Sequence, residues 1–198
     1  MHRTCRSRCA VVVLAWALMG AGAQAFTMVV IDAGHGGKDP GCHWNGLVEK
    51  NLCLDVAKRL RDVLEARGVK TVMTRDSDKY LDLSERAAIS NRHSGVVFVS
   101  IHFNASRNHH ISGFEVHNRS KKGLALARHI GKGLEKAVKA RRREGDWQDY
   151  KVLRETKAAA VLVECGFISN KAEAERCATT GHRQALARGI ADGIMMEN

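Results

Sequence analysis

The amino-acid sequence predicts an α/β fold with a largely parallel sheet. Apolar, β-branched segments of strand length alternate along the chain with longer segments whose apolar residues recur at helical spacing. This alternation is typical of a parallel sheet layered with helices. With 198 residues, 44% of them hydrophobic, and a single proline, the chain has the composition of one globular domain without a proline-rich linker.

The first half of the chain contains two predicted strands and two predicted helices. Residues 26–32 (FTMVVID) are mainly apolar and β-branched, as in a buried strand. Residues 49–67 carry apolar side chains at helical spacing, and Gly68 ends this helix in the usual way. A short strand is predicted over residues 69–74 and a short helix over residues 83–91. The order is therefore strand, helix, strand, helix.

The second half continues the same alternation. Residues 96–101 (VVFVSI) form another strand that is apolar on both faces, and residues 114–117 form a shorter one. Ser120 can cap a helix that extends to Val138, and residues 159–163 form a further apolar strand. The last helix carries three apolar residues at helical spacing, Leu186, Ile190 and Ile194. No internal repeat or change in composition divides the chain, so we expect one domain.

The first 25 residues have the three-part pattern of a secretory signal peptide. Three arginines precede an apolar run over residues 9–21, and Ala23 and Ala25 are the small residues that a signal peptidase reads. The run is shorter than the ~20 residues that a transmembrane helix needs. We therefore predict cleavage after Ala25 and an exported protein without a stable membrane anchor. A single domain is expected over residues 26–198.

The chain is strongly basic. Its formal net charge is +11, and removal of the three arginines before the apolar run lowers it to about +8. A charge of this sign indicates an anionic partner. Nucleic acid is disfavoured because the protein is predicted to be exported and because no aromatic residues interleave the basic run. That run comprises Lys139, Arg141, Arg142 and Arg143, and we interpret it as the solvated, positively charged end of a helix.

Four cysteines remain after removal of the leader: Cys42, Cys53, Cys165 and Cys177. An exported protein can form disulfides, but four cysteines are too few for a disulfide-built scaffold of this length. Free thiols and a single bridge both remain open at this point.

Side chains with metal-binding chemistry follow three of the predicted strands. His35 follows the first strand, His102 the third and Glu164 the fifth, while Glu49 opens the first helix. Ligands of open parallel sheets bind beyond the carboxyl ends of the strands, so these residues are expected at one edge. Two histidines and a carboxylate are a common ligand set for catalytic zinc. The spacing does not decide which glutamate is the ligand and which is the base.

Five segments carry a family resemblance: residues 32–41 (DAGHGGKDPG), 49–50 (EK), 74–76 (TRD), 100–105 (SIHFNA) and 162–170 (LVECGFISN). In this order and spacing they resemble the zinc-dependent N-acetylmuramoyl-L-alanine amidases of the type 3 amidase family, over nearly the whole of the chain after the leader. The resemblance implies a single twisted, mostly parallel sheet of about six strands, flanked by helices on both faces. The single domain would then be a catalytic amidase domain.

The resemblance also implies an activity and a site. The activity is Zn²⁺-dependent hydrolysis of the amide bond between N-acetylmuramic acid and L-alanine in bacterial peptidoglycan, for wall remodelling, daughter-cell separation or wall turnover. The implied zinc ligands are His35, Glu49 and His102, and the implied catalytic acid–base residue is Glu164. Asn104 is a candidate for a hydrogen bond to the substrate, although stabilisation of its own loop explains it equally well. The alternative function is a zinc peptidase that cuts within the peptidoglycan stem peptide.

Peptidoglycan is the partner that the resemblance implies. We expect a monomer in the periplasm or at the cell wall, held to the carboxylate-bearing polymer by its positive charge. Some members of the family carry an inhibitory helix over the zinc, but residues 118–150 have room for only one ordinary helix and a short loop. We therefore predict an unblocked site, and the sequence does not indicate an activator protein.

Overall fold

The computed structural model describes residues 26–144 and 149–197. The predicted signal peptide, with its cleavage site after Ala25, lies outside these residues. Within the two described ranges, no helix combines the length and the apolar character that crossing a lipid bilayer demands.

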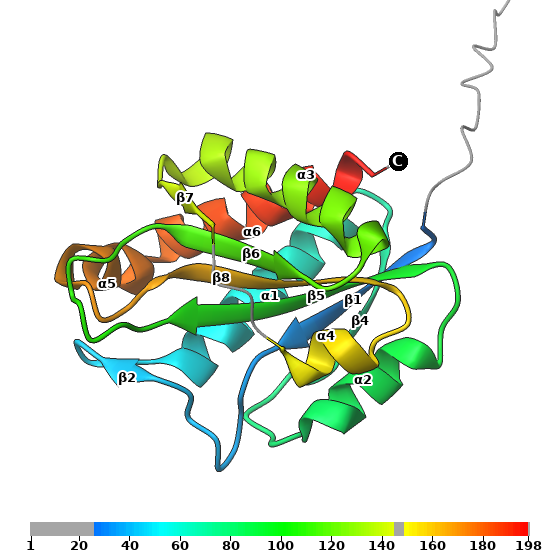
Figure 1. Ribbon diagram of the computed structural model, residues 1–198, viewed down its shortest axis with the longest axis horizontal. Helices are drawn as coiled ribbons and strands as arrows, with labels where there is room; N and C mark the ends of the chain where they lie inside the picture. Colours follow the sequence, from blue (N-terminus) through cyan, green and yellow to red (C-terminus); the bar gives the residue numbers. More distant parts are fainter. Residues whose placement is uncertain (1–25, 145–148, 198) are drawn as a thin grey trace, which may run out of the picture.

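A six-stranded sheet in the order β4-β1-β5-β8-β6-β7 forms the centre of the molecule (Figure 1). The first four strands in this order are parallel, β6 runs antiparallel to β8, and β7 is parallel to β6. The predicted mostly parallel sheet of about six strands is confirmed. The strands are β1 (Met28–Ala33), β4 (Lys70–Met73), β5 (Val96–Asn104), β6 (Phe114–Asn118), β7 (Arg142–Arg143) and β8 (Ala159–Phe167).

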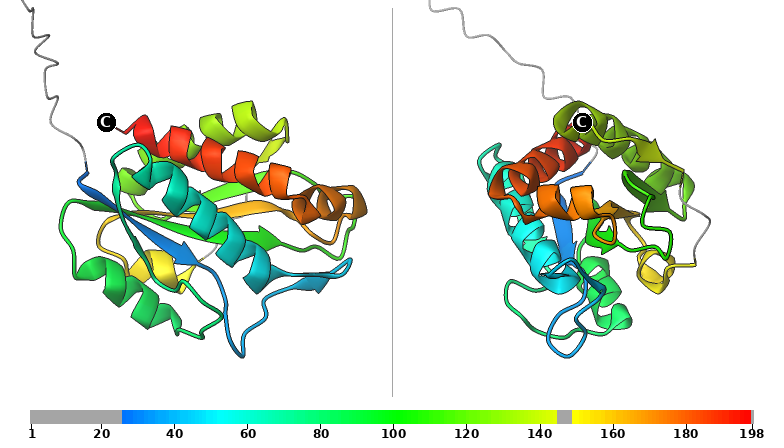
Figure 2. Two further views of the ribbon diagram at one scale, coloured as in Figure 1. Left: turned by 180° about the vertical axis from the view of Figure 1, so that it is seen from behind. Right: turned by 90° about the vertical axis from the view of Figure 1, so that its left-hand side faces the viewer.

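Helices cover both faces of this sheet, as predicted (Figures 1 and 2). One layer consists of α1 (Glu49–Glu65), α3 (Lys121–Val138) and α6 (Thr180–Met195), with α6 packed between the other two. The opposite layer consists of α2 (Leu83–Asn91) and α4 (Lys151–Glu155), which contact each other. The remaining helix, α5 (Lys171–Ala178), contacts α6 and β8.

Alternate side chains of the strands supply two apolar cores. Val29 and Ile31 of β1 pack in the core that contains α1, α3 and α6, whereas Val30 packs with Phe98 of β5 against α2 and α4. Because both faces are covered, the central strands consist mainly of apolar residues, as their sequences indicated. Replacing a fully buried side chain such as Phe98 by alanine typically costs about 3–5 kcal/mol. The four cysteines of the described residues are free thiols.

Two strands extend further than the sequence pattern indicates. β5 continues to Asn104 and β8 to Phe167, so His102 and Glu164 lie within strands and not in the loops after them. These two residues are partners in the register of β5 and β8. Their side chains therefore lie next to each other on the face that α2 and α4 cover.

Several short elements are absent from the sequence prediction: α4, α5, β7, and a hairpin of β2 (His43–Trp44) and β3 (Leu47–Val48). The basic run after α3 requires a correction. α3 ends at Val138, Lys139 takes a left-handed conformation with φ of 48°, and Arg142 and Arg143 then pair with β6. The interpretation of the run as a solvated helix end is wrong for these two half-buried arginines, because the left-handed turn directs the chain back to the sheet.

Candidate metal centre

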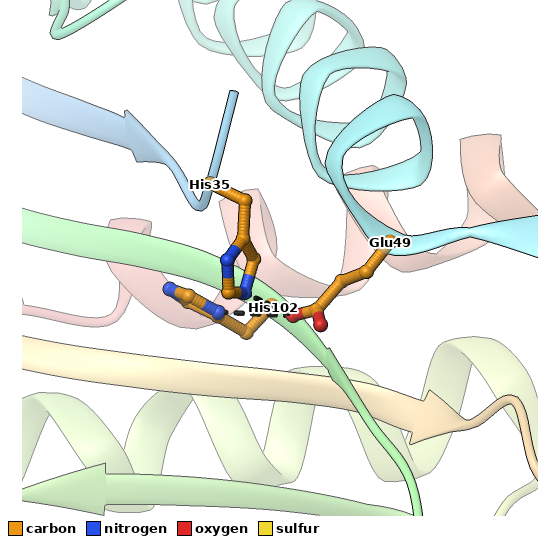
Figure 3. A group of neighbouring side chains, drawn as sticks. All are labelled: His35, Glu49 and His102. Atoms are coloured by element: carbon orange, nitrogen blue, oxygen red, sulfur yellow. Dashed lines mark hydrogen bonds and ion pairs between the residues drawn. The ribbon is translucent and has the colours of Figure 1, made fainter. Parts of the chain in front are cut away.

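Three side chains from three separate elements converge near the carboxyl end of the parallel strands (Figure 3). His35 lies in the loop after β1, Glu49 is the first residue of α1, and His102 lies in β5. Their metal-binding atoms all lie within 4.8 Å of one another. Glu49 Oε1 is 3.0 Å from His35 Nε2 and 3.0 Å from His102 Nδ1. The structure thus brings together the three residues that the resemblance implies as ligands.

The donor atoms of this cluster fit a metal ion. Two imidazole nitrogens and one carboxylate oxygen form a donor set of open catalytic metal sites. Ligands bound tetrahedrally at ~2.0–2.1 Å lie roughly 3.3 Å apart. The 3.0 Å separations of Glu49 Oε1 from the two histidine nitrogens are close to this spacing.

Two glycines leave the space that the cluster occupies. A Cβ atom at Gly34 would lie 2.4 Å from His102 Cε1, and one at Gly41 would lie 2.6 Å from Glu49 Oε2. Gly41 also has a φ of 67°, a conformation that glycine adopts readily. His35 itself has a φ of 58°, which is uncommon for a residue with a side chain and is held here by the contacts around the loop.

Hydrogen bonds fix the orientation and charge of the cluster. Asp39 Oδ2 lies 2.8 Å from His35 Nδ1, and with Nδ1 as the donor, Nε2 is left to bind a metal. Burial opposes the charged form of His35, but hydrogen bonds to Glu49 and Asp39 outweigh burial and raise its pKa. Burial also opposes the charge of Glu49, but hydrogen bonds to His102 and His35 outweigh it and hold the pKa of Glu49 well below its usual range. Two backbone N–H groups donate to the same carboxylate, at 2.8 and 3.1 Å.

A buried ion pair supports the loop that carries His35. Asp32 and Arg86 are 1% and 2% exposed, and Asp32 Oδ1 lies 2.9 Å from Arg86 Nη1. The same guanidinium donates to the backbone carbonyls of Ala33 at 2.6 Å and His35 at 2.7 Å. Arg75 donates to two carbonyls of this loop at 2.7 and 2.9 Å. Hydrogen bonds from Arg75 and Arg86 to backbone carbonyls therefore fix the backbone around His35.

Glu164 faces the cluster from the neighbouring strand. It is 7% exposed, and its Oε2 atom is buried without a hydrogen-bond partner among the described residues. Burial, and then the negative charges of Glu49 and Glu115, raise the pKa of Glu164 well above its usual value. A buried carboxyl group beside a cluster of metal-binding side chains has the chemistry that general acid–base catalysis requires.

A cavity of about 410 Å³ opens over these residues, and residues at the start of α4 also line it. Asn104 lines this cavity, while its Oδ1 accepts a hydrogen bond from the N–H of Ala105 at 2.8 Å. This hydrogen bond is a contact within its own loop, and the hydrogen bond of Asn104 to a substrate stays a prediction. α3, the helix within residues 118–150, packs on the opposite face of the sheet and does not cover the cavity.

Sequence reasoning missed three residues around this site. Asp39 could have been recognised, because its carboxylate follows His35 by four residues within the same motif. Tyr150, which lines the cavity, and Glu115, the register partner of Glu164, carry no such signal. Glu115 reaches the site because β6 lies beside β8 in the sheet. Tyr150 reaches it because α4, which begins after Tyr150, packs on the same face of the sheet.

Comparison with known proteins shows similarity along most of the chain. Residues 29–196 match the profile of a family described as N-acetylmuramoyl-L-alanine amidase. The chain is 36% identical over 171 residues to the sporulation-specific N-acetylmuramoyl-L-alanine amidase of Bacillus subtilis. The match covers 84% of this chain and 66% of that protein, so the chain spans just under two thirds of the length of this relative.

Several solved structures share the fold of this chain, and two amidases are among them. The N-acetylmuramoyl-L-alanine amidase AmiC2 of Nostoc punctiforme has a TM-score of 0.82 and 34% identity, over 88% of this chain and 98% of that one. The CwlD amidase of Clostridioides difficile, solved in complex with the GerS lipoprotein, has a TM-score of 0.82 and 28% identity, over 86% and 98%.

Proposed function

Because the chain belongs to the N-acetylmuramoyl-L-alanine amidase family, we propose that it hydrolyses the amide bond between N-acetylmuramic acid and L-alanine in peptidoglycan. One observation carries this proposal: three metal-binding side chains converge beside a buried carboxyl group whose Oε2 atom has no hydrogen-bond partner within residues 26–144 and 149–197. A metal centre next to an acid–base residue is the arrangement that metal-assisted hydrolysis needs.

Zinc is the metal that we propose for His35, Glu49 and His102. Zn²⁺ accepts both imidazole nitrogen and carboxylate oxygen, and three protein ligands leave a position open for chemistry. When bound, it supplies Lewis acidity, which polarises the amide carbonyl and favours attack by water at neutral pH.

We assign the proton transfers to Glu164. Its Oε2 accepts a proton from the attacking water, and the same carboxyl group donates that proton to the alanine nitrogen as the C–N bond breaks. The leaving group then departs as a neutral amine. The raised pKa of Glu164 suits a group that must hold a proton between these two steps. We also assign to Asn104, which lines the cavity, a hydrogen bond to the substrate.

The proposed site of action is the cell wall, after removal of residues 1–25. The basic charge of the chain favours attraction to the carboxylates of peptidoglycan. Two measurements test this part of the proposal. The amino-terminal sequence of the protein recovered from the cell envelope should begin at Phe26, and binding to purified wall should weaken as salt is raised. An uncleaved terminus or salt-independent binding would contradict it.

Substitution of the acid–base residue tests the assignment of roles. Glu164→Gln should keep the metal, because Glu164 does not belong to the ligand cluster. The same change should lower amidase activity by about 100- to 10,000-fold, the usual effect of losing such a group. Activity close to wild type with full metal content would refute the role of Glu164.

Histidine substitutions test the ligand set. His35→Ala and His102→Ala should lose zinc, measured by elemental analysis of the purified proteins. His117→Ala is the matched control, because this histidine lies on the same face of the sheet but is hydrogen-bonded to Glu115 and is not in the cluster. Equal zinc contents in all three variants would exclude the proposed site.

A further inference from the structure

Four polar side chains form a row across four adjacent strands. His102 of β5 is the register partner of Glu164 in β8, Glu164 is the partner of Glu115 in β6, and Glu115 is the partner of Arg143 in β7. Partners in register project from the same face of a sheet. The row therefore begins at the metal cluster, passes through the proposed acid–base residue and ends at an arginine on the sheet edge.

The guanidinium group at the end of this row has unused hydrogen-bonding capacity. Arg143 Nε is a buried atom 3.5 Å from Glu115 Oε1, at the outer range of an ion pair, and it has no hydrogen-bond partner in the part of the chain that the structure describes. The group lies over the ring of Phe167, with 5.7 Å between Cζ and the ring centroid. Glu115 Oε2, by contrast, lies 3.2 Å from His117 Nε2. An arginine has five N–H donors, and the four on its two terminal nitrogens can bind a carboxylate with two parallel hydrogen bonds.

Arg143 lines a second cavity that adjoins the first. This cavity has a volume of about 290 Å³, and Asn104 and Tyr150 border both cavities. Its other polar side chains include Glu115 and His117. A ligand that occupies the first cavity can therefore extend past Glu164 and into the second.

The spacing suits a peptide that continues from the scissile amide. Neighbouring strands are ~4.8 Å apart, so the Cα atoms of Glu164 and Arg143 are separated by roughly 10 Å. In an extended peptide, a carboxylate on the residue after alanine lies about 6 Å from the alanine nitrogen, given 3.8 Å between successive Cα atoms. A carboxylate at this position falls between Glu164 and Arg143, within reach of the guanidinium.

We propose that the second cavity binds the peptide side of the substrate and that Arg143 pairs with a free α-carboxylate on the residue after L-alanine. This inference rests on the proposed amidase function. It makes Arg143 a specificity-determining residue, which distinguishes stem peptides that have this carboxylate free from those in which it is a primary amide.

Two synthetic muropeptides that differ only in this group, free acid or amide, provide the test. Wild-type enzyme should cleave the free acid with a kcat/KM about 10- to 100-fold higher, as expected for hydrogen bonds to a charged group. Arg143→Gln should lose this advantage and cleave both peptides at nearly the same rate. Arg142→Gln is the matched control, because it removes the same charge from the same strand, while the Arg142 guanidinium lies against Gly131 of α3 on the other face. It should keep the wild-type preference.

Binding measured by calorimetry separates this inference from the amidase activity. Glu164→Gln protein should bind the free-acid muropeptide more tightly than the amide, and Glu164→Gln/Arg143→Gln should bind both equally. Hydrolysis of both peptides by wild type without preference would overturn the role of Arg143 and leave the amidase function intact. A binding preference that depends on Arg143, without hydrolysis of either peptide, would support the subsite and refute the amidase function. Equal loss of activity on both peptides in Arg143→Gln would also overturn the proposal.

Discussion

Arg86→Met should destabilise the protein severely, because it leaves the buried carboxylate of Asp32 without its positively charged partner. Arg86 and Asp32 are almost inaccessible to solvent, and the guanidinium makes its hydrogen bonds to Asp32 and to the carbonyls of Leu81, Ala33 and His35. Methionine occupies a similar volume but supplies no donor. The variant therefore leaves the Asp32 carboxylate without its counter-ion and three carbonyls without this donor.

The size of the effect follows from this burial. Removing one partner of a buried ion pair typically costs about 3–5 kcal/mol. For a chain of this length, each kcal/mol lowers Tm by roughly 2–4 °C, so a fall of about 6–20 °C is expected in thermal unfolding followed by circular dichroism. Zinc affinity should fall as well, because the loop that carries His35 loses a support.

A second substitution distinguishes the effect of the unpaired Asp32 charge from the effect of lost side-chain packing at position 86. Asp32→Asn added to Arg86→Met removes the uncompensated charge, so the double variant should recover part of the lost stability. In the wild type, Thr74 and Ser100 each donate a hydrogen bond to one Asp32 oxygen, at 2.6 Å. In the double variant one hydroxyl can still donate to the amide oxygen, and the other can accept from the amide nitrogen. A fall in Tm of less than about 3 °C in the single variant, or no recovery in the double variant, would refute this reasoning.

Two further predictions follow from contacts already described. Gly34→Ala should reduce zinc content in elemental analysis, because the new Cβ atom would lie 2.4 Å from His102 Cε1. Gly181→Ala in α6, with nothing within 4 Å of its Cβ position, should bind zinc normally; full zinc content in Gly34→Ala would contradict this reasoning. Asp55→Asn should lower Tm at pH 7. Burial raises the pKa of Asp55, but hydrogen bonds from Arg59 and Arg183 outweigh burial and lower it, so the carboxylate stabilises the fold above the unfolded-state pKa of ~3.9. That contribution disappears as pH falls through the folded-state pKa, and the difference in Tm should shrink below about pH 4; a difference that stays constant with pH would contradict it.

The sequence predicts the parallel part of the fold well, because strands that are buried on both faces appear in the sequence as short, mainly apolar runs. His35 follows an apolar strand, and His102 and Glu164 lie near the ends of two others. The rule that ligands lie at the carboxyl ends of strands places these residues together. Spacing alone does not assign the roles of Glu49 and Glu164, because both carboxylates approach the same edge and their charge states depend on neighbours that only the folded chain brings near.

The antiparallel edge of the sheet could not be predicted in this way. A five-residue strand such as β6 does not reveal its direction, and the basic character of Arg142 and Arg143 suggests solvent and not a strand. The left-handed conformation of Lys139, which no sequence rule favours for lysine, turns the chain back to β6. The row from His102 to Arg143 exists only as a consequence of that turn.

Digestion of purified peptidoglycan with and without a metal chelator, with the product masses recorded, tests the proposed amidase function most directly. The proposed function predicts free stem peptides that begin with an unblocked L-alanine amine, glycan strands with intact muramic acid, and no release in the presence of chelator. Fragments cut within the stem peptide would indicate a peptidase, and release that is unaffected by chelator would contradict the metal site.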